Sequence, residues 1–177
     1  GWLGPLTHHV LLGPTEDVGP RLAITSAGAV TAVWTRDDAT DQVLARLRAA
    51  SGNWSDVLLL SEAAENSRNP EILVAGSLTW VVYEIEAATL QSIAIVGIED
   101  DPDPIGRTIV ATTTSMDPLD ARVHEGDGHL WVTWVDDDSV GWTERISGTW
   151  LSPQFEGLDP GGVERARDRI LEIVTGR

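Results

Sequence analysis

The chain of 177 residues contains no cysteine and no lysine. Without cysteine, the protein cannot form disulfide bonds, use a thiolate nucleophile or build cysteine-based zinc or iron–sulfur sites. Without lysine, Schiff-base chemistry and a phosphate-binding loop that depends on lysine are excluded as well. The apolar runs are also short, and none reaches the length of about 18 residues that a membrane-spanning helix requires. We therefore expect no membrane insertion.

The basic side chains are all arginines, and these 12 residues face 28 acidic ones, so the formal net charge is −16. A surface this acidic repels nucleic acid and anionic lipid, and we expect no nucleic-acid partner. Hydrophobic residues make up 42% of the chain and charged residues 23%, which is typical of a folded globular protein. The acidity slightly favours an extracellular or cell-surface bacterial location, while the compartment itself stays unknown.

What the sequence does contain is one pattern that occurs three times. Trp34, Tyr83 and Trp134 hold the same place in it, and each is about fifty residues from the next. Two short apolar runs flank a glycine-containing turn before each aromatic residue, and an acidic turn and a third β-like run follow it. Glycine supplies the positive φ that tight hairpin turns require. Internal repeats of this length predict β-propeller blades, each of four short antiparallel strands.

The predicted fold is therefore all-β, with about three four-stranded antiparallel blades, an N-terminal strand and a C-terminal amphipathic α-helix. The repeat region covers residues 1–158, with the extra strand around Leu6–Leu12. The blades are predicted at residues 19–61, 69–115 and 119–158.

The last segment, residues 159–177, has the pattern of a helix instead of a strand. Asp159 is placed as its N-cap, and Pro160 stands at the first helical position. Apolar residues follow at helical spacing, namely Val163, Ala166, Ile170, Ile173 and Val174. We expect this helix to pack on its own propeller, and a blade edge or a neighbouring chain are the alternatives.

The repeats also share prolines and corners. Pro20 and Pro70 stand near the start of two repeats, and the corners Ser51–Trp54 and Ser147–Trp150 both read Ser-Gly-x-Trp. This order resembles the BNR or Asp-box repeats of sialidase-like β-propellers over nearly the whole chain except the last helix. A full Asp box reads Ser-x-Asp-x-Gly-x-Thr-Trp, and neither corner keeps the Asp. In that family the boxes are folding corners away from the active site, so the resemblance implies the fold and not an activity.

The resemblance also sets an expectation for catalysis. Sialidases of this superfamily hold a substrate carboxylate with three arginines and use a tyrosine–glutamate nucleophile with an aspartic acid/base. The chain has one tyrosine, Tyr83, at a position where the other repeats have tryptophan, so we expect it to pack between blades. Arg36 and Arg68 lie in segments that would face the same end, and a third arginine is missing. We therefore assign no catalytic residue.

The sequence predicts a non-catalytic propeller module that binds a protein or glycan partner. The alternative is a glycoside hydrolase, sialidase-like enzyme or a fragment of one, because a glycosidase needs two carboxyls across its substrate. Glu84, Glu86, Asp37 and Asp136 would be the carboxyl candidates from adjacent blades.

The acidic turns are the main ligand-binding candidates. Asp37–Asp38 and Asp136–Asp138 hold the same place in two blades, on the face where the resemblance implies that ligands bind. Clustered carboxylates suit calcium, but no EF-hand spacing is present, so we expect no cofactor and no metal ligand, with calcium as the alternative. Trp142, beside the third acidic turn, could stack on a sugar ring. The candidate ligand-binding residues are Arg36, Asp37, Asp38, Arg68, Glu84, Asp136, Asp137 and Trp142.

Three blades do not close a ring, because four blades are about the minimum. An open array would leave two apolar blade faces in water, and exposed patches of that size normally mark an interface. We expect either a homodimer through the open blade edges or a fragment whose missing blades precede Gly1. A monomer that is capped by the terminal helix is the third alternative.

Overall fold

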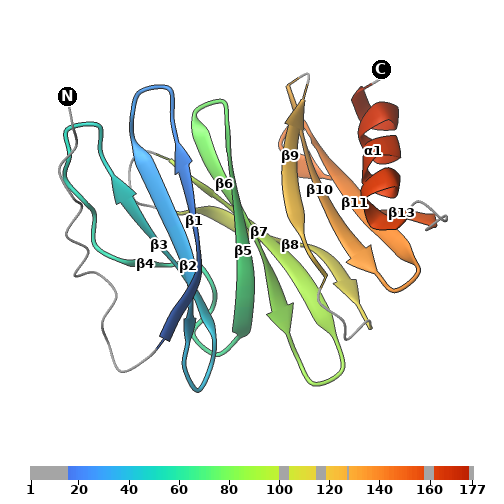
Figure 1. The fold of residues 1–177 in the computed structure, drawn as a ribbon, viewed down its shortest axis with the longest axis horizontal. Helices are drawn as coiled ribbons and strands as arrows, with labels where there is room; N and C mark the ends of the chain where they lie inside the picture. The colour runs from blue at the N-terminus through green and yellow to red at the C-terminus, as the bar shows by residue number, and fades with distance from the viewer. Residues whose placement is uncertain (1–15, 100–103, 115–118, 127, 158–161, 176–177) are drawn as a thin grey trace.

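In the computed structural model of the chain, the described residues are 16–99, 104–114, 119–126, 128–157 and 162–175. They form three antiparallel sheets and one helix, so the fold is nearly all β (Figure 1). The predicted N-terminal strand around Leu6–Leu12 and the predicted helix start at Asp159 and Pro160 lie outside the described residues.

The strands of each sheet pair in chain order, except that the fifth strand of the third sheet pairs with the third strand of that sheet. The first sheet contains β1 (Glu16–Ile24), β2 (Val30–Asp37), β3 (Gln42–Arg48) and β4 (Leu58–Leu59). The second sheet contains β5 (Asn66–Ala75), β6 (Leu78–Glu86), β7 (Gln91–Ile98) and β8 (Pro104–Thr113). The third sheet contains β9 (Arg122–Gly126), β10 (His129–Asp136), β11 (Ser139–Ile146), β12 (Thr149–Trp150) and β13 (Gln154–Gly157). The helix α1 (Gly162–Thr175) follows.

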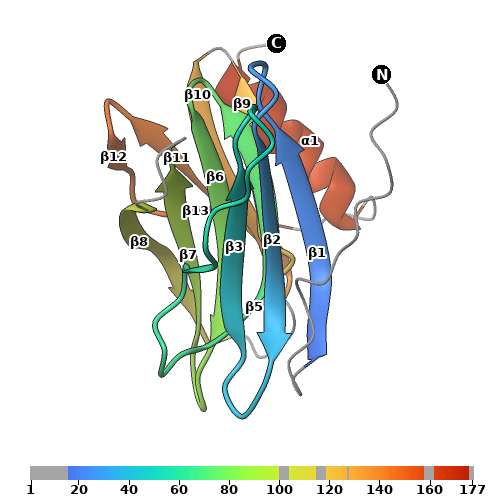
Figure 2. The same cartoon turned by 90° about the vertical axis from the view of Figure 1, so that its left-hand side faces the viewer.

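The sheets stack face to face, and apolar layers fill the space between them (Figures 1 and 2). Val33 and Val43 of the first sheet pack with Tyr83 of the second in one layer. Trp80 of the second sheet packs with Trp134 of the third in the other layer. Because residues three apart on a strand point to opposite faces, β6 supplies Tyr83 to one layer and Trp80 to the other. The prediction that Tyr83 packs between two sheets is confirmed.

The helix α1 covers the face of the third sheet that points away from the second sheet. Ala166 and Ile170 are fully buried and form a small cluster with Val140 of β11, against which Trp142 packs. The helix therefore packs on its own chain, as the sequence predicted. The expectation of two exposed end faces is wrong for this end, because the helix occupies the position that a further sheet would take. Among the described residues, no helix is long and apolar enough to cross a membrane.

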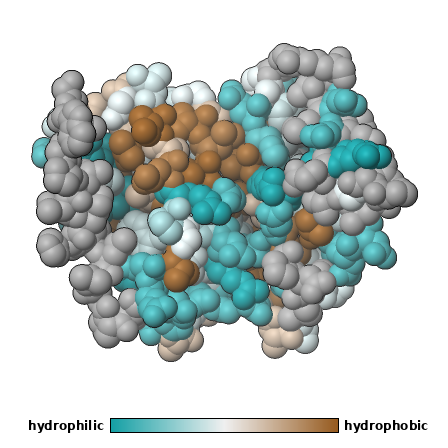
Figure 3. All heavy atoms as spheres, in the orientation of Figure 1, coloured by the Kyte–Doolittle hydropathy of each residue, from teal (hydrophilic) through white to brown (hydrophobic). Residues whose placement is uncertain are grey.

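The first strands of the three sheets lie side by side, with β1 in contact with β5 and β5 in contact with β9 (Figure 1). We call β1, β5 and β9 the inner strands. An apolar patch covers the upper part of β1 and its surroundings (Figure 3), where Leu22 and Ile24 are each 66% exposed. The lower part of the same surface is polar, and it holds the candidate site.

Candidate functional site

The site begins with irregularities in the inner strands. Register shifts interrupt β1 at Gly19–Pro20 and β5 at Asn69–Pro70. Proline has no N–H to donate to the sheet, so within a strand it is confined to an edge or a bulge. Gly19 and Asn69 have left-handed φ values of 61° and 53°, and Asp120, just before β9, has a φ of 45°. Left-handed non-glycine residues are uncommon, and they cluster at functional sites.

The three left-handed residues hold equivalent positions in their sheets. In each sheet, one residue directly precedes the left-handed residue. It lies opposite the residue that directly follows Trp34, Tyr83 or Trp134. These pairs are Val18 with Thr35, Arg68 with Glu84, and Leu119 with Val135. Because bulges redirect side chains beside them, β1, β5 and the segment that leads into β9 present a repeated irregularity at one level of the stack.

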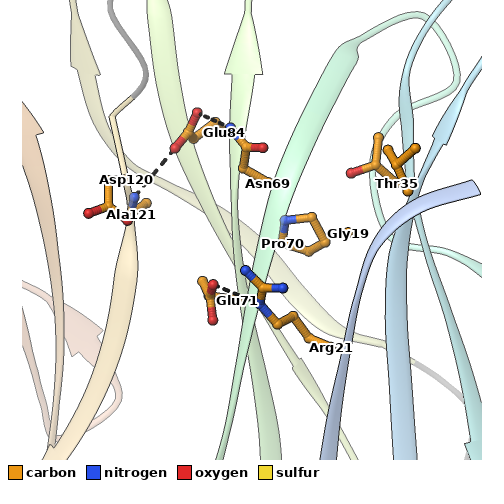
Figure 4. A pocket seen from close by; sticks show the side chains of 10 residues that line it. Gly19, Arg21, Thr35, Asn69, Pro70, Glu71, Glu84, Asp120 and Ala121 are labelled. Carbon is orange, nitrogen blue, oxygen red and sulfur yellow. Dashed lines mark hydrogen bonds and ion pairs between the residues drawn. The ribbon is translucent and has the colours of Figure 1, made fainter.

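These irregularities surround a pocket of about 260 Å³ (Figure 4). Its walls come from all three sheets: from β1 and β2, from β5 and β6, and from the segment that leads into β9. The lining residues are Val18, Gly19, Arg21, Thr35, Asn69, Pro70, Glu71, Glu84, Asp120 and Ala121. The pocket thus depends on residues that are about a hundred positions apart in the sequence.

Glu84 is the most buried charged group of this pocket, with 1% exposure. One of its oxygens, Oε2, accepts a hydrogen bond from Asn69 Nδ2 at 2.9 Å. The other, Oε1, accepts one from the backbone N–H of Ala121 at 3.4 Å. A buried carboxylate is tolerated when donors satisfy its oxygens. Glu84 therefore joins the second and third sheets at the wall of the pocket.

The remaining charged groups of the pocket are also paired. Arg21 Nε lies 2.9 Å from Glu71 Oε1, so this pair links β1 with β5. The carboxylate of Asp120 lies 2.9 Å from Arg167 Nη1 of α1 and 3.1 Å from Arg122 Nη2. Burial alone would raise the pKa of Asp120, but the hydrogen bonds and charges of the two arginines outweigh it and lower this pKa. Asp120 is therefore ionised at neutral pH.

Of the residues that were predicted from the sequence as ligand-binding candidates, Glu84 lines the pocket. The two arginines among them are engaged with carboxylates near the ends of strands. Arg36 Nε lies 3.3 Å from Asp17 Oδ1, and Arg68 Nη1 lies 2.8 Å from Glu86 Oε2. Arg36 and Arg68 thus pair within their own sheets, outside the lining of this pocket.

The acidic turns lie at the lower rim in Figure 1, at the ends of different sheets. Asp37 is the last residue of β2, with Asp38 in the turn that follows, and Asp136 is the last residue of β10, with Asp137 next to it. Asp136 accepts a hydrogen bond from Thr113 at 2.6 Å. Within the described residues, no group of three or more histidine, cysteine or acidic residues is placed to hold a metal ion. The expectation of no cofactor, with calcium as the alternative, stays a prediction.

Trp142 lies on β11 and is half-buried against the cluster under α1. Its ring therefore contributes to helix packing, and its predicted contact with a sugar stays a prediction.

Sequence reasoning missed Asn69 and Asp120, which line the pocket. For Asn69 the available signal was the Asn-Pro pair inside an apolar strand pattern, matched by the Gly-Pro pair at Pro20, because such a pair indicates a bulge. Asp120 is followed by Ala121 and carries no such signal.

No protein-family model matches the chain, and no curated protein matches it. Among solved structures, the chain is similar to a mutant of the Bombyx mori GH32 β-fructofuranosidase in complex with sucrose. The TM-score is 0.50 and the sequence identity is 11%. The similarity covers 78% of this chain and 37% of that enzyme's chain. This likeness confirms the predicted fold class, a β-propeller-like arrangement, and says nothing about the substrate.

Proposed function

We propose that the chain is a non-catalytic β-propeller-like module that binds a neutral glycan in the pocket between the inner strands. The observation that carries this proposal is the convergence of three equivalent left-handed residues, one from each sheet, on a polar pocket. Carboxylate oxygens accept hydrogen bonds from hydroxyl groups, and an asparagine side chain can both donate and accept. Glu71, Glu84, Asp120 and Asn69 thus offer partners for several sugar hydroxyls.

The charge of the pocket favours a neutral ligand over an anionic one. Its lining contains the three carboxylates Glu71, Glu84 and Asp120 against one arginine, Arg21, which is already paired with Glu71. The whole chain has a formal charge of −16. The negative charge of the lining and that of the whole chain both disfavour the binding of a sialic acid or another acidic sugar. The proposed site therefore lies at the bulges of the inner strands, and not at the acidic turns that the sequence first suggested.

The pairing of the carboxylates supports binding in preference to hydrolysis. A glycosidase needs one carboxylic acid that keeps its proton near neutral pH, which requires a raised pKa. The pKa of Asp120 is instead lowered by two arginines. Glu84 accepts hydrogen bonds with both oxygens, and Glu71 is held by Arg21.

A glycan array that carries neutral and acidic oligosaccharides tests the proposal, followed by calorimetric titration of the neutral sugars that bind. We expect Glu84→Gln to weaken binding at least tenfold, because the pocket loses a charged acceptor. Glu86→Gln is the matched control, since Glu86 lies two residues further on β6 and outside the pocket lining. Binding of acidic glycans alone would contradict the proposal, and so would release of sugar from a glycoside by the wild-type chain.

The homodimer that the open ring predicts stays a prediction. Because α1 covers the outer face of the third sheet, a second copy could reach that face only after the helix moved. Light scattering of the full chain tests this: a stable mass of 19.1 kDa, that of one chain, would contradict the dimer.

A further inference from the structure

The side chain of Arg167 on α1 contacts Asp120, which lines the pocket. Arg167 is 2% exposed, although it belongs to a surface helix. Its Nη1 lies 2.9 Å from the carboxylate of Asp120, and its Nη2 donates to the backbone carbonyl of the same residue. A buried arginine requires such partners. One guanidinium group therefore fixes both the side chain and the main chain of Asp120.

Asp120 is the point at which the chain turns into the pocket wall. Its φ of 45° is a left-handed conformation that a non-glycine residue adopts only when the surroundings hold it. The next residue, Ala121, donates its N–H to Glu84 Oε1. Glu84 in turn accepts from Asn69. A continuous series of contacts thus runs from α1 through Asp120 and Ala121 to the two polar side chains on the opposite wall.

Two further described side chains attach α1 to the sheet. Ala166 and Ile170 pack on Val140 with Trp142 beside them, and a helix of 14 residues is marginal in water without such packing. Arg122 also contacts the Asp120 carboxylate, from the strand itself, at 3.1 Å. If the helix undocked and moved Arg167 away, Arg122 could still pair with the Asp120 carboxylate. The contact of Arg167 with the Asp120 backbone carbonyl would be lost. The backbone conformation at Asp120 therefore depends on the docked helix.

We propose that α1 is a positioning element for the pocket, and that Arg167 is the positioning residue that couples helix docking to ligand binding. The coupling to ligand binding rests on the proposed glycan-binding function. In this proposal, helix docking and sugar binding both depend on the conformation of Asp120, so each equilibrium shifts the other by the same factor. A bound sugar that contacts Glu84 or Asp120 must then stabilise the docked helix, and an undocked helix must weaken sugar binding.

The test uses the full chain with Arg167→Met, which keeps the length of the buried stem and removes the hydrogen bonds. Arg165→Met is the matched control, because Arg165 is exposed on the same helix and the charge change is identical. Ile170→Ala is a second variant that loosens the helix without touching the Arg167–Asp120 contact. Amide hydrogen exchange of Ala121 reports on the pocket wall, and titration with sucrose and with neutral sugars from the array reports on binding.

We expect Arg167→Met and Ile170→Ala to accelerate exchange at Ala121 at least tenfold, with the amides of β2 and β3 unchanged, and to weaken sugar binding by a similar factor. Arg165→Met should match the wild type in both measurements. Unchanged exchange at Ala121 in both variants overturns the proposal, and so does faster exchange with unchanged sugar affinity. If the wild type binds none of the sugars while exchange rises in both variants, the glycan function fails and the positioning of the wall by α1 stands.

Discussion

The layers between the sheets and the pocket at the inner strands are built in opposite ways. In the layer between the second and third sheets, Trp134 is fully buried among apolar neighbours and lies opposite Gly141 on the next strand. At the pocket, the backbone of Asn69 and Asp120 is left-handed and the side chains are polar and paired. The layers supply burial, which stabilises the fold, whereas the pocket supplies strained and polar positions, which suit binding. Substitutions should therefore separate the two regions, with losses of stability in the layers and losses of binding at the pocket.

The largest effect is expected for Gly141→Ala. A Cβ atom at this position would overlap several atoms of the Trp134 ring, because the indole lies directly across the glycine. Overpacking of a buried site typically costs about 1–3 kcal/mol, and we expect the upper end here because the ring is enclosed. Urea denaturation measures the loss. Gly157→Ala, on the neighbouring strand β13, is the matched control, since its Cβ would meet nothing within 4 Å. Equal stability of the two variants would contradict the packing argument.

A polar contact inside the other layer should cost less. Tyr83 donates its hydroxyl to the Leu60 carbonyl at 2.9 Å and accepts from Arg107 Nε at 2.8 Å. In Tyr83→Phe both partners lose this bond, although Arg107 keeps its ion pairs with Glu62 and Glu65. We expect a loss of about 1–2 kcal/mol in the free energy of unfolding, since the buried Leu60 carbonyl and Arg107 Nε each lose this hydrogen bond. Sugar affinity should not change, and a clear change would show that the layers and the pocket are not separate.

The fold could be predicted because its signals are local. Trp34, Tyr83 and Trp134 recur at one place in three repeats, and each is buried in the structure at 3% exposure or less. Glycine marks the first hairpin turn of each sheet, and Gly28, Gly76 and Gly128 all have positive φ. Alternation and turn residues are properties of short segments, so the sequence alone indicates them.

The pocket could not be predicted in the same way, because its residues meet only when three sheets stack. Asn69 and Asp120 are 51 positions apart, and neither follows the repeat aromatic or an acidic run. Their roles depend on local backbone irregularities and on left-handed φ values. These features change the direction in which a side chain points, and the pattern of apolar and polar residues does not predict that change. Asp37 and Asp136 were predicted as ligand-binding candidates because they stand in acidic runs of the sequence, yet they lie at the ends of separate sheets.

At the pocket, two substitutions of Asn69 distinguish backbone strain from side-chain chemistry. Asn69→Ala and Asn69→Gly both remove the hydrogen bond to Glu84, so both should weaken sugar binding to the same extent. Alanine must keep a φ near 53°, whereas glycine adopts this conformation without strain. We expect Asn69→Ala to be about 1 kcal/mol less stable than Asn69→Gly in urea denaturation. Equal stability would mean that the bulge relaxes when the asparagine is lost.

The smallest effect concerns pH and Asp120. Because the folded state lowers the pKa of this carboxyl below its ordinary value of 3.8, its ionised form favours folding above that pH. As the pH falls below 3.8 the unfolded chain takes up the proton first, so the contribution is lost progressively down to the folded-state pKa. Asp120→Asn removes this titration while it keeps the backbone carbonyl that Arg167 contacts. The carboxylate is 48% exposed, so solvent screens the pairs and the difference should be small. Unfolding free energies of both proteins at pH 7 and pH 3 measure it: the advantage of the wild type should shrink at the lower pH, and an advantage that stays constant would show that the arginines do not stabilise the charge.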